Sequence, residues 1–347
     1  MPMKGSMPSQ KSYRLIMLFL LVALVATSLV ALCIGRYSID PAEAFGAIRT
    51  YTQKLMAGTG EKPTAMENVI FVLRIPRIIG AILIGAALSL SGAVYQSVFN
   101  NPLVSPDILG VSSGASVGAA TAILLGGSII TRQVLAFAIG LASVLLSTAI
   151  PKLLKNSSNL MLVLSGTIVG GFMCSVLGVL KFIAEEDTEL SSIIYWQMGS
   201  VQSMKMDTIA YIAPIFIGCA VVLVLLSWQL NILSFGENEA RTLGVNLKWL
   251  RGITIVLSSM LTASAVSVSG TIGWIGLIIP HLGRLCVGSD NTKVVPVSMM
   301  MGGLFLLLID TIARTVTSLE VPLSILTGLI GAPIYAWLLW KQKARVM

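Results

Sequence analysis

Residues 252–283 read GITIVLSSMLTASAVSVSGTIGWIGLIIPHLG and contain no Asp, Glu, Lys or Arg. Because a hydrocarbon core of about 30 Å needs about 20 helical residues, this stretch is too long for one membrane span and short for two. Its centre, Ser269-Gly270, is the natural break, since glycine weakens a helix interior. Taken as one span, the stretch gives the chain nine spans; divided at Ser269-Gly270, it gives ten.

The composition of the whole chain points to a lipid bilayer. Apolar residues make up 55% and charged residues 11%, with a mean hydropathy of +0.89, whereas an average soluble domain carries about 25% charged residues. The formal charge of +8 is scattered between apolar runs, which excludes disorder and a nucleic-acid-binding patch. Those runs do not alternate at period two, as an outer-membrane barrel would. The sequence therefore predicts an all-α polytopic membrane protein without a nucleic-acid partner.

Eight further stretches lack charged residues, and we expect one span in each, the seventh only by including Asp310. They cover residues 15–35, 78–106, 108–131, 133–151, 156–180, 208–236, 294–309 and 321–340. We interpret the first as a retained span because it lacks a small-residue cleavage site. The short apolar piece at 190–204 cannot cross the bilayer as a helix, so we expect it at the outer surface or dipping back in.

The charges at the two ends of the chain decide the number of spans. Lys4, Lys11 and Arg14 precede the first span, and Lys341, Lys343 and Arg345 follow the last, with no acidic residue among either set. Basic flanks favour the cytoplasmic side, so both termini are expected there and the count is even. We therefore predict ten transmembrane helices in the cytoplasmic membrane. Residues 1–14 and 341–347 form cytoplasmic tails, and 15–340 form a single transmembrane domain.

The chain lacks the motifs of several enzyme classes. It has no Gly-x-x-x-x-Gly-Lys-Ser/Thr loop for a nucleoside triphosphate, and its one histidine, His281, excludes a His-Glu-x-x-His zinc site. Four scattered cysteines, at positions 33, 174, 219 and 286, are interpreted as small apolar residues, with a disulfide or metal site as the alternative. We therefore predict no enzymatic activity and no resident cofactor or metal.

Asp310 is the one acidic residue well inside a predicted span. An intramembrane carboxylate is a candidate proton relay, as an ion-coupled carrier would need. Arg314 lies four residues further on, however, and an i,i+4 ion pair between Asp310 and Arg314 accounts for the charge equally well. We predict this intramembrane pair and keep the ion-coupled secondary carrier as the alternative from another class.

Two polar or small-residue patterns indicate how the helices are arranged. Gly110, Gly114 and Gly118 recur every fourth residue on one helix face, and Gly166 and Gly170 repeat the spacing, which predicts tight helix packing. The segment FGENEARTLGVN, residues 235–246, has the make-up of a short helix with a glycine at each end. Such a helix on the inner face could dock into a soluble partner, or it could be a solvated connection.

The chain closely resembles the FecCD/BtuC-like permease subunits of ATP-binding-cassette importers for iron–siderophores, haem and vitamin B12. The resemblance extends over about residues 70–340, and its motifs stand in the family's order. They are RIPRIIG at 74–80, GAALSLSGAVYQ at 85–96, NPL at 101–103, PDILGVSSG at 106–114, WQMGS at 196–200, GTIGWIGLIIPHLGR at 270–284, DTIAR at 310–314 and GLIGAP at 328–333. Any one of these motifs is weak, but the ordered set is highly specific.

The resemblance implies the BtuC-like fold, with ten helices per subunit, and a set of partners. A second permease subunit would complete a homodimer or a paired heterodimer with the translocation path between the two copies. Two ATPase subunits would bind the inner face and hold ATP and Mg, while an extracytoplasmic binding protein would deliver substrate to the outer face. The coupling loop, at about residues 231–247, would be the ATPase-docking element. Its implied docking residues are Glu237, Glu239, Ala240, Arg241, Leu243 and Gly244.

The resemblance also implies two further sets of site residues. Arginines on the outer face of similar permeases pair with glutamates of the binding protein, and the matching positions are Arg74, Arg77 and Arg314. Similar permeases close the path on the inner side with the Asn-Pro-Leu turn and the loop before the fifth span. The implied cytoplasmic gate residues are Asn101, Pro102, Leu103, Ser158, Asn159 and Leu160, with Ser157 beside them.

The expected substrate is a bulky metal chelate, because the walls of the path are mostly apolar and made of small residues. An iron–siderophore is the first candidate, and haem and vitamin B12 are the alternatives within the same system. ATP hydrolysis in the partner subunits would supply the energy.

Overall fold

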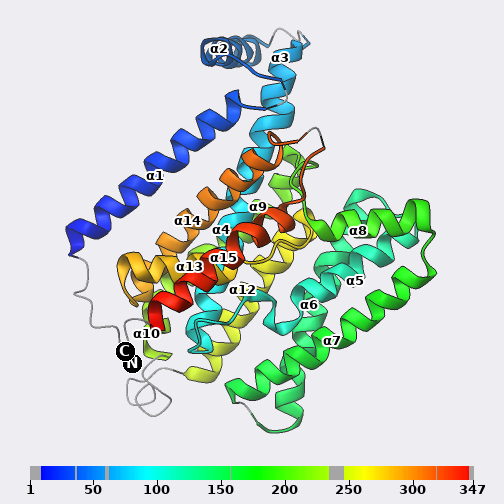
Figure 1. Cartoon of the computed structure of the whole chain (residues 1–347), viewed down its shortest axis with the longest axis vertical. Helices are drawn as coiled ribbons and strands as arrows, with labels where there is room; N and C mark the ends of the chain where they lie inside the picture. The colour runs from blue at the N-terminus through cyan, green and yellow to red at the C-terminus, as the bar shows by residue number, and fades with distance from the viewer. Residues whose placement is uncertain are drawn as a thin grey trace.

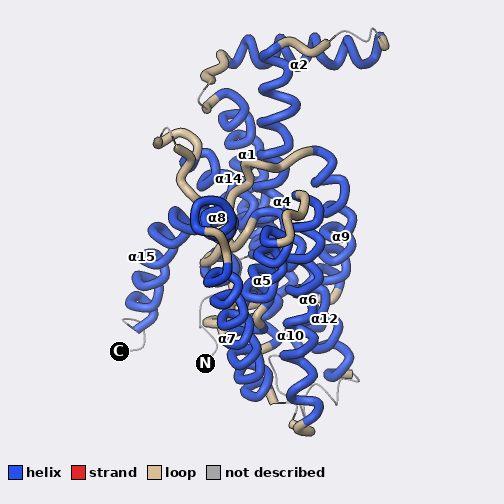
Figure 2. The backbone as a smooth tube through the Cα atoms, turned by 90° about the vertical axis from the view of Figure 1, so that its right-hand side faces the viewer, coloured by secondary structure: helices blue, strands red, loops and turns tan. Residues whose placement is uncertain are grey.

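The computed structural model describes residues 9–35, 37–58, 62–156, 158–233, 246–317 and 319–343. Within these residues the secondary structure is helical throughout, without a strand (Figure 2). Eight helices are long and apolar enough to cross a membrane. They are α1 (Gln10–Cys33), the continuous helix Ala65–Val98, α6 (Ile129–Leu153), α7 (Asn159–Ile183), α9 (Met206–Leu225), α12 (Leu247–Ser269), α14 (Asn291–Ala313) and α15 (Leu323–Lys343).

Two shorter apolar helices bring the number to ten, in agreement with the predicted count. They are α5 (Val111–Leu124) and α13 (Ile275–Val287), each about 20 Å long at 1.5 Å per residue, which is less than the bilayer core. The stretch 252–283 is divided where the sequence indicated, because α12 ends at Ser269 and α13 begins at Ile275. Gly270 permits this break with a φ of +70°, a conformation that favours glycine.

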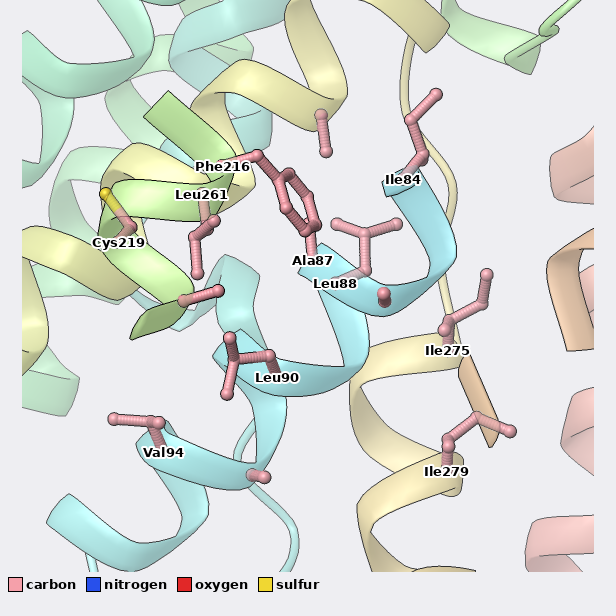
Figure 3. Packing of buried hydrophobic residues seen from close by; sticks show 14 of the residues in the cluster. Ile84, Ala87, Leu88, Leu90, Val94, Phe216, Cys219, Leu261, Ile275 and Ile279 are labelled. Carbon is pink, nitrogen blue, oxygen red and sulfur yellow. The ribbon is translucent and has the colours of Figure 1, made fainter. Parts of the chain in front are cut away.

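Helix α4 (Ile75–Val98) lies at the centre of the body, among α9, α12, α13 and α14 (Figure 1). Nearly the whole of α4 is buried. Figure 3 shows Leu90 and Val94 of α4 in the same apolar cluster as Phe216 of α9, Leu261 of α12 and Ile279 of α13. A membrane helix that is apolar on every side and buried on every side is the scaffold on which the other helices pack.

Glycines set the closest of these helix contacts. A Cβ atom added at Gly85 of α4 would overlap the carbonyl oxygen of Gly302 in α14, and one added at Gly92 would overlap that of Gly276 in α13. The backbones therefore touch at both crossings, as expected where van der Waals packing replaces the hydrophobic drive between helices in lipid. This makes α4, α13 and α14 one closely packed unit.

The glycine stripe predicted from the sequence packs a second group of helices, α5, α6 and α7 (Figure 1). A Cβ at Gly114 or Gly118 would overlap backbone or side-chain atoms of α6, whereas Gly110 and Gly166 approach the contact between α7 and the 3-10 turn η2 (Pro106–Leu109). The prediction of tight packing is confirmed. The predicted helix face holds for Gly114 and Gly118 only, because Gly110 precedes α5 as its N-cap with a φ of +79° and approaches α7.

A transverse helix, α2 (Pro41–Ala57), lies across one end of the body (Figures 1 and 2). It is held by a stack of Tyr51 on Phe71, with ring centroids 4.1 Å apart, and by an ion pair of 3.3 Å between Lys54 and Glu67. Its supports, α3 (Ala65–Asn68) and the π-helical turn η1 (Val69–Arg74), continue directly into α4. None of the charge-free stretches in the sequence indicated this helix, because α2 carries charged residues along its length. We call this end of the body the α2 end.

The opposite end carries the short helix α10 (Ser227–Leu233), and we call it the α10 end (Figure 1). Helix α1 begins, and helix α15 finishes, toward this end (Figure 1). The start of the first span and the end of the last therefore lie at the same end of the bundle, as an even number of spans requires. Between α7 and α9, the π-helical turn η3 (Glu186–Leu190) precedes the predicted non-crossing piece, residues 190–204, which contains the short helix α8 (Ser191–Met198).

Large apolar side chains remain exposed along the outer helices. Examples are Phe19 and Val22 of α1 and Ile168 and Phe172 of α7. A water-soluble chain would bury such continuous apolar faces, whereas lipid solvates them. The molecule is a multi-pass membrane protein.

Candidate functional site

The α2 end is organised around the guanidinium group of Arg77, near the start of α4. Nε donates to both carboxylate oxygens of Asp310 at 3.0 Å, and Nη2 donates to Oδ1 at 2.8 Å. The remaining contacts reach Glu320, with Nη1 to Oε1 and Nη2 to Oε2 both at 2.9 Å. Two carboxylates thus share one arginine, which ties α4 to the end of α14 and to the segment before α15. Such bidentate, charge-assisted bonds are the strongest hydrogen bonds available to side chains.

The predicted pairing of Asp310 with Arg314 is wrong. The carboxylate of Asp310 is fully buried and is bound by Arg77 instead. Nη2 of Arg314 donates to the backbone oxygen of Ala31 in α1. Arg77 and Asp310 are distant in sequence but lie at the same end of two antiparallel, touching helices, so local i,i+4 spacing could not reveal the pair.

The three arginines expected to meet a binding protein are buried in this structure, with relative exposures of 5% for Arg74, 9% for Arg77 and 6% for Arg314. Arg74 donates to the backbone oxygens of Leu32 and Tyr37. These guanidinium groups are therefore bound within the subunit in this structure, and their role in docking a binding protein stays a prediction. The cause of the burial of Arg74 and Arg314 is the end of α1 and the residue Tyr37 beyond it, whose backbone carbonyl groups accept from these guanidinium groups. Arg77 is instead enclosed by its two carboxylate partners.

Glu320 completes this cluster and was not singled out in the sequence analysis. It lies just before the last apolar stretch, where an acidic residue looks like an ordinary span boundary. Asp310 is saturated by Arg77, and a saturated carboxylate in an ion pair is poorly placed to relay protons. The geometry at this end therefore favours a structural cluster over an ion-coupling site.

The predicted ATPase-docking residues, Glu237, Glu239, Ala240, Arg241, Leu243 and Gly244, lie outside the described residues. Their two flanks are described. α10 leads into the segment at Leu233, and Asn246 caps α12 on its far side, where its Oδ1 accepts from the N–H of Trp249 at 3.1 Å. A polar segment at the α10 end is thus held between two helix ends.

The predicted gate residues that the structure describes gather at the same end. Asn101 forms an Asx turn, in which its Oδ1 accepts from the N–H of Leu103 at 2.9 Å, and Pro102 lies exposed between them. Nδ2 of Asn159 donates to the backbone oxygen of Val98 at 3.4 Å. Leu160 is exposed, and Ser157 lies outside the described residues. The end of α4 and the start of α7, distant in sequence, are therefore in contact.

A cavity of about 300 Å³ opens between these elements. Its lining combines the predicted gate with both flanks of the predicted coupling loop, namely Val98, Asn100, Ser158, Asn159, Leu233, Leu247 and Arg251. The predicted gate and the described flanks of the predicted coupling loop, Leu233 and Leu247, therefore lie side by side. Their proximity is what a mechanism that passes movement from one to the other requires.

A second polar cluster, which the sequence analysis did not single out, lies close to this cavity. The guanidinium of Arg284 donates to Oε1 of Gln96 and, at 3.3 Å, to the hydroxyl of Ser97. Ser97 lies 2.7 Å from Oδ1 of Asn291, the first residue of α14. Arg284 is the last residue of the motif at 270–284. The sequence therefore contained the residue within a family motif, but its partners on α4 and α14 could be identified only from the fold.

Asp290 caps α14 at the edge of this cluster. Its Oδ1 accepts from the N–H of Thr292 at 3.0 Å and from Nδ2 of Asn231 at 2.8 Å. Partial burial alone would raise the pKa of Asp290, but the hydrogen bonds from Asn231 and Thr292 outweigh it and lower the pKa below its usual value. The carboxylate is therefore held in its charged form.

The apolar helices of the described residues form the body of a polytopic membrane protein. A sequence model of the FecCD transport family matches residues 20–341. The chain belongs to this family. Its relatives are permease subunits of ABC transporters whose ATPase activity resides in separate subunits, and the chain is not itself an enzyme.

Curated relatives carry different substrate names. The chain is 39% identical to the molybdate import permease MolB of Haemophilus influenzae over 96% of this chain and 97% of that protein. It is 41% identical to a permease of Helicobacter pylori named for iron chelatin transport, over 82% of this chain and 86% of that one. It is 36% identical to the cobalamin import permease BtuC of Halobacterium salinarum, over 82% and 77%.

Solved structures agree on the fold. One, named for an inward-facing conformation of a metal-chelate type ABC transporter, superposes with a TM-score of 0.84 at 38% identity, covering 94% of this chain and 99% of that one. A second, PsaBC from Streptococcus pneumoniae, has a TM-score of 0.54 at 17% identity, covering 83% and 94%, and supports the fold alone.

Proposed function

We propose that this permease imports a metal-containing solute across the cytoplasmic membrane, driven by two ATPase subunits that bind the α10 end. The observation that carries the proposal is the family match over residues 20–341, in a chain without a nucleotide-binding motif. In this arrangement the α10 end and both termini face the cytoplasm. A second permease subunit completes the path, and an extracytoplasmic binding protein delivers the solute at the α2 end.

In the proposed mechanism, ATP binding draws the ATPases together, and they displace the coupling loop at about residues 231–247. The proximity of α10, the start of α12 and the turn at Asn101 supports a short route from this loop to the gate. Because the packed helices resist bending, displacement of the loop moves them as blocks, which closes the path at one end and opens it at the other.

Charge reversal in the coupling loop tests the docking assignment. Glu239→Lys should reduce co-purification of the ATPase subunits by about ten-fold or more, because a reversed charge at an interface is repelled by the group that it formerly attracted. Glu186→Lys is the matched control, since Glu186 is exposed in η3, outside the proposed ATPase-binding segment. Unchanged assembly with Glu239→Lys would remove the loop from the mechanism.

For the substrate, a bulky ferric chelate such as an iron–siderophore is the first candidate. Two observations support it, namely the relative named for iron chelatin transport and the solved metal-chelate type transporter. Molybdate is the second candidate, because MolB matches this chain almost end to end. Haem and vitamin B12 remain alternatives within the same system, and the BtuC relatives support the latter.

A direct comparison of solutes tests this order. The permease, its ATPases and its binding protein are reconstituted in vesicles, and uptake of a radioactive ferric siderophore, molybdate, haem and cyanocobalamin is measured. We expect ATP-dependent uptake of the ferric chelate and little of the others. Uptake of molybdate instead would reverse the order of the two candidates while leaving the ATP-driven permease intact.

A further inference from the structure

Helix α10, which leads into the proposed coupling loop, is fastened to α14 by the side chain of Asn231. Its Nδ2 donates to Oδ1 of Asp290 at 2.8 Å, and its Oδ1 accepts from the backbone N–H of Asn291, also at 2.8 Å. One amide group thus satisfies the residue before α14 and the first residue within it. Both bonds are partly buried, where hydrogen bonds are strengthened by the low dielectric constant.

The polar contacts continue beyond Asn231 into the centre of the body. The side chain of Asn291 lies 2.7 Å from the hydroxyl of Ser97 in α4, and that hydroxyl accepts from Arg284 of α13 at 3.3 Å. Gln96 closes the set, since it accepts from Arg284 and donates to the backbone oxygen of Leu277 at 3.1 Å. A single network therefore joins α10 to α14, α4 and α13.

The two ends of this network lie next to different functional elements of the proposed transporter, the coupling loop and the gate. Asn231 stands two residues before Leu233, the last described residue before the stretch 234–245 that holds the proposed docking residues. Gln96 and Ser97 stand in the last turn of α4, just ahead of the turn formed by Asn101 to Leu103. The backbone contacts of α4 with α13 and α14 make those three helices a unit, so a load applied at Asn231 acts on all of them.

We propose that Asn231 is a positioning residue that fastens the coupling loop to the α4–α13–α14 unit, so that displacement of the loop moves the gate. Without it, α10 would shift on its apolar contacts alone and the movement would be lost locally. This inference rests on the proposed function. It adds the specific side-chain contact through which movement of the coupling loop is transmitted to the other helices.

Exchanging the two side chains tests the joint. Asn231→Asp places a carboxylate against Asp290 and breaks the bond between them, whereas the double variant Asn231→Asp with Asp290→Asn restores a donor facing an acceptor. Asp at 231 can still accept from the N–H of Asn291, so the exchange keeps both contacts of residue 231, although the atom of residue 290 that turns into Nδ2 no longer accepts from the N–H of Thr292. Ser91→Ala is the matched control, because it removes a buried interhelical bond of 2.9 Å, to the backbone oxygen of Ser258, away from α10.

The readout is the movement of the gate in the complete importer. Spin labels at Leu103→Cys, in a background with the four native cysteines replaced by alanine, report the distance between the two permease copies before and after ATP and vanadate. Leu103 is 57% exposed and accepts a label without repacking the core. ATP hydrolysis and ATPase binding are measured on the same samples, so a loss of transmission is separated from a loss of assembly.

We expect Asn231→Asp to reduce the ATP-dependent change in distance at least about two-fold while ATPase binding persists, and the exchanged double variant and Ser91→Ala to keep it. A full change in Asn231→Asp, a failure of the exchange to restore it, or an equal loss in Ser91→Ala would overturn the inference. If Asn231→Asp fails to fold, the exchanged variant and Asn231→Ala provide the same comparison. No ATP-dependent change in the unmodified importer would instead refute the proposed function itself.

Discussion

The two ends of this permease are held together by different chemistry. At the α2 end, Arg77 binds two carboxylates, Asp310 and Glu320, through five hydrogen bonds between full charges. At the α10 end, the neutral side chains of Asn231, Asn291 and Ser97 join the helices, and the charges of Asp290 and Arg284 are bound by these neutral groups.

The difference indicates where each end tolerates rearrangement. Removing one member of a buried ion pair leaves an uncompensated charge and costs about 3–5 kcal/mol, whereas a neutral hydrogen bond contributes about 1 kcal/mol. The helix contacts at the α2 end should therefore be costlier to break than those at the α10 end. The following predictions test this contrast, in order of expected effect.

Arg77→Ala should have the largest effect. It leaves Asp310 charged and fully buried, so we expect the free energy of unfolding in detergent micelles to fall by about 3–5 kcal/mol. The double variant Arg77→Met with Asp310→Leu removes both charges and should recover most of that loss. If Arg77→Ala costs no more than a neutral substitution at the α10 end, the contrast between the ends is wrong.

Gln96→Leu should have an intermediate effect at the α10 end. It removes an acceptor from Arg284 and a donor from the backbone oxygen of Leu277, for which we expect a loss of about 2 kcal/mol in unfolding free energy. Gln96→Glu, which offers Arg284 a charged acceptor, is the comparison and should lose less. Equal losses in both variants would show that side-chain packing, not the bond to Arg284, determines stability at this site.

Glu320→Gln should cost less, about 1 kcal/mol, although it removes a charge from the strongest cluster. Glu320 is partly exposed and Arg77 keeps its bonds to Asp310, so no buried charge is left alone. Thermal unfolding of the purified permease measures the loss. A loss as large as that of Arg77→Ala would mean that Glu320, not Asp310, is the essential partner.

The smallest predicted effect is a pH dependence from Asp290. Its pKa is lowered in the folded chain, so the stabilisation it provides is present above the unfolded pKa of about 4 and is lost as the pH falls through the lower, folded value. Asp290→Asn should flatten this acid limb of the stability curve in detergent. An unchanged curve would show that the bonds from Asn231 and Thr292 do not favour the charged form.

Much of this architecture could be predicted from the sequence. The break at Gly270, the glycine face of α5 and the ordered family motifs are local signals, and each was confirmed by the structure or the comparisons. The partner of Asp310 could not be predicted, because i,i+4 spacing offered Arg314 while the fold placed Arg77 nearer. The burial of Arg74 was missed for the same reason, since its acceptors are backbone oxygens of Leu32, at the end of α1, and of Tyr37 beyond it.

The polar contacts at the α10 end could not be predicted from the sequence for the same reason. Asn231, Ser97 and Asn291 are ordinary residues in their own segments, and only the packing of α10 on α4 and α14 brings them together. The sequence shows which segments are polar and which are apolar. Which polar groups meet depends on helix contacts between residues far apart in the chain.

The central claim is that this chain is a passive conduit that receives work from separate ATPases at its α10 end. The most direct measurement is uptake of a radioactive ferric siderophore into vesicles that contain the permease with its binding protein, with and without the ATPase subunits, in the absence of any ion gradient. The account predicts uptake only when the ATPases and ATP are both present. Uptake by the permease without its ATPases, or uptake that requires an ion gradient and ignores ATP, would contradict it.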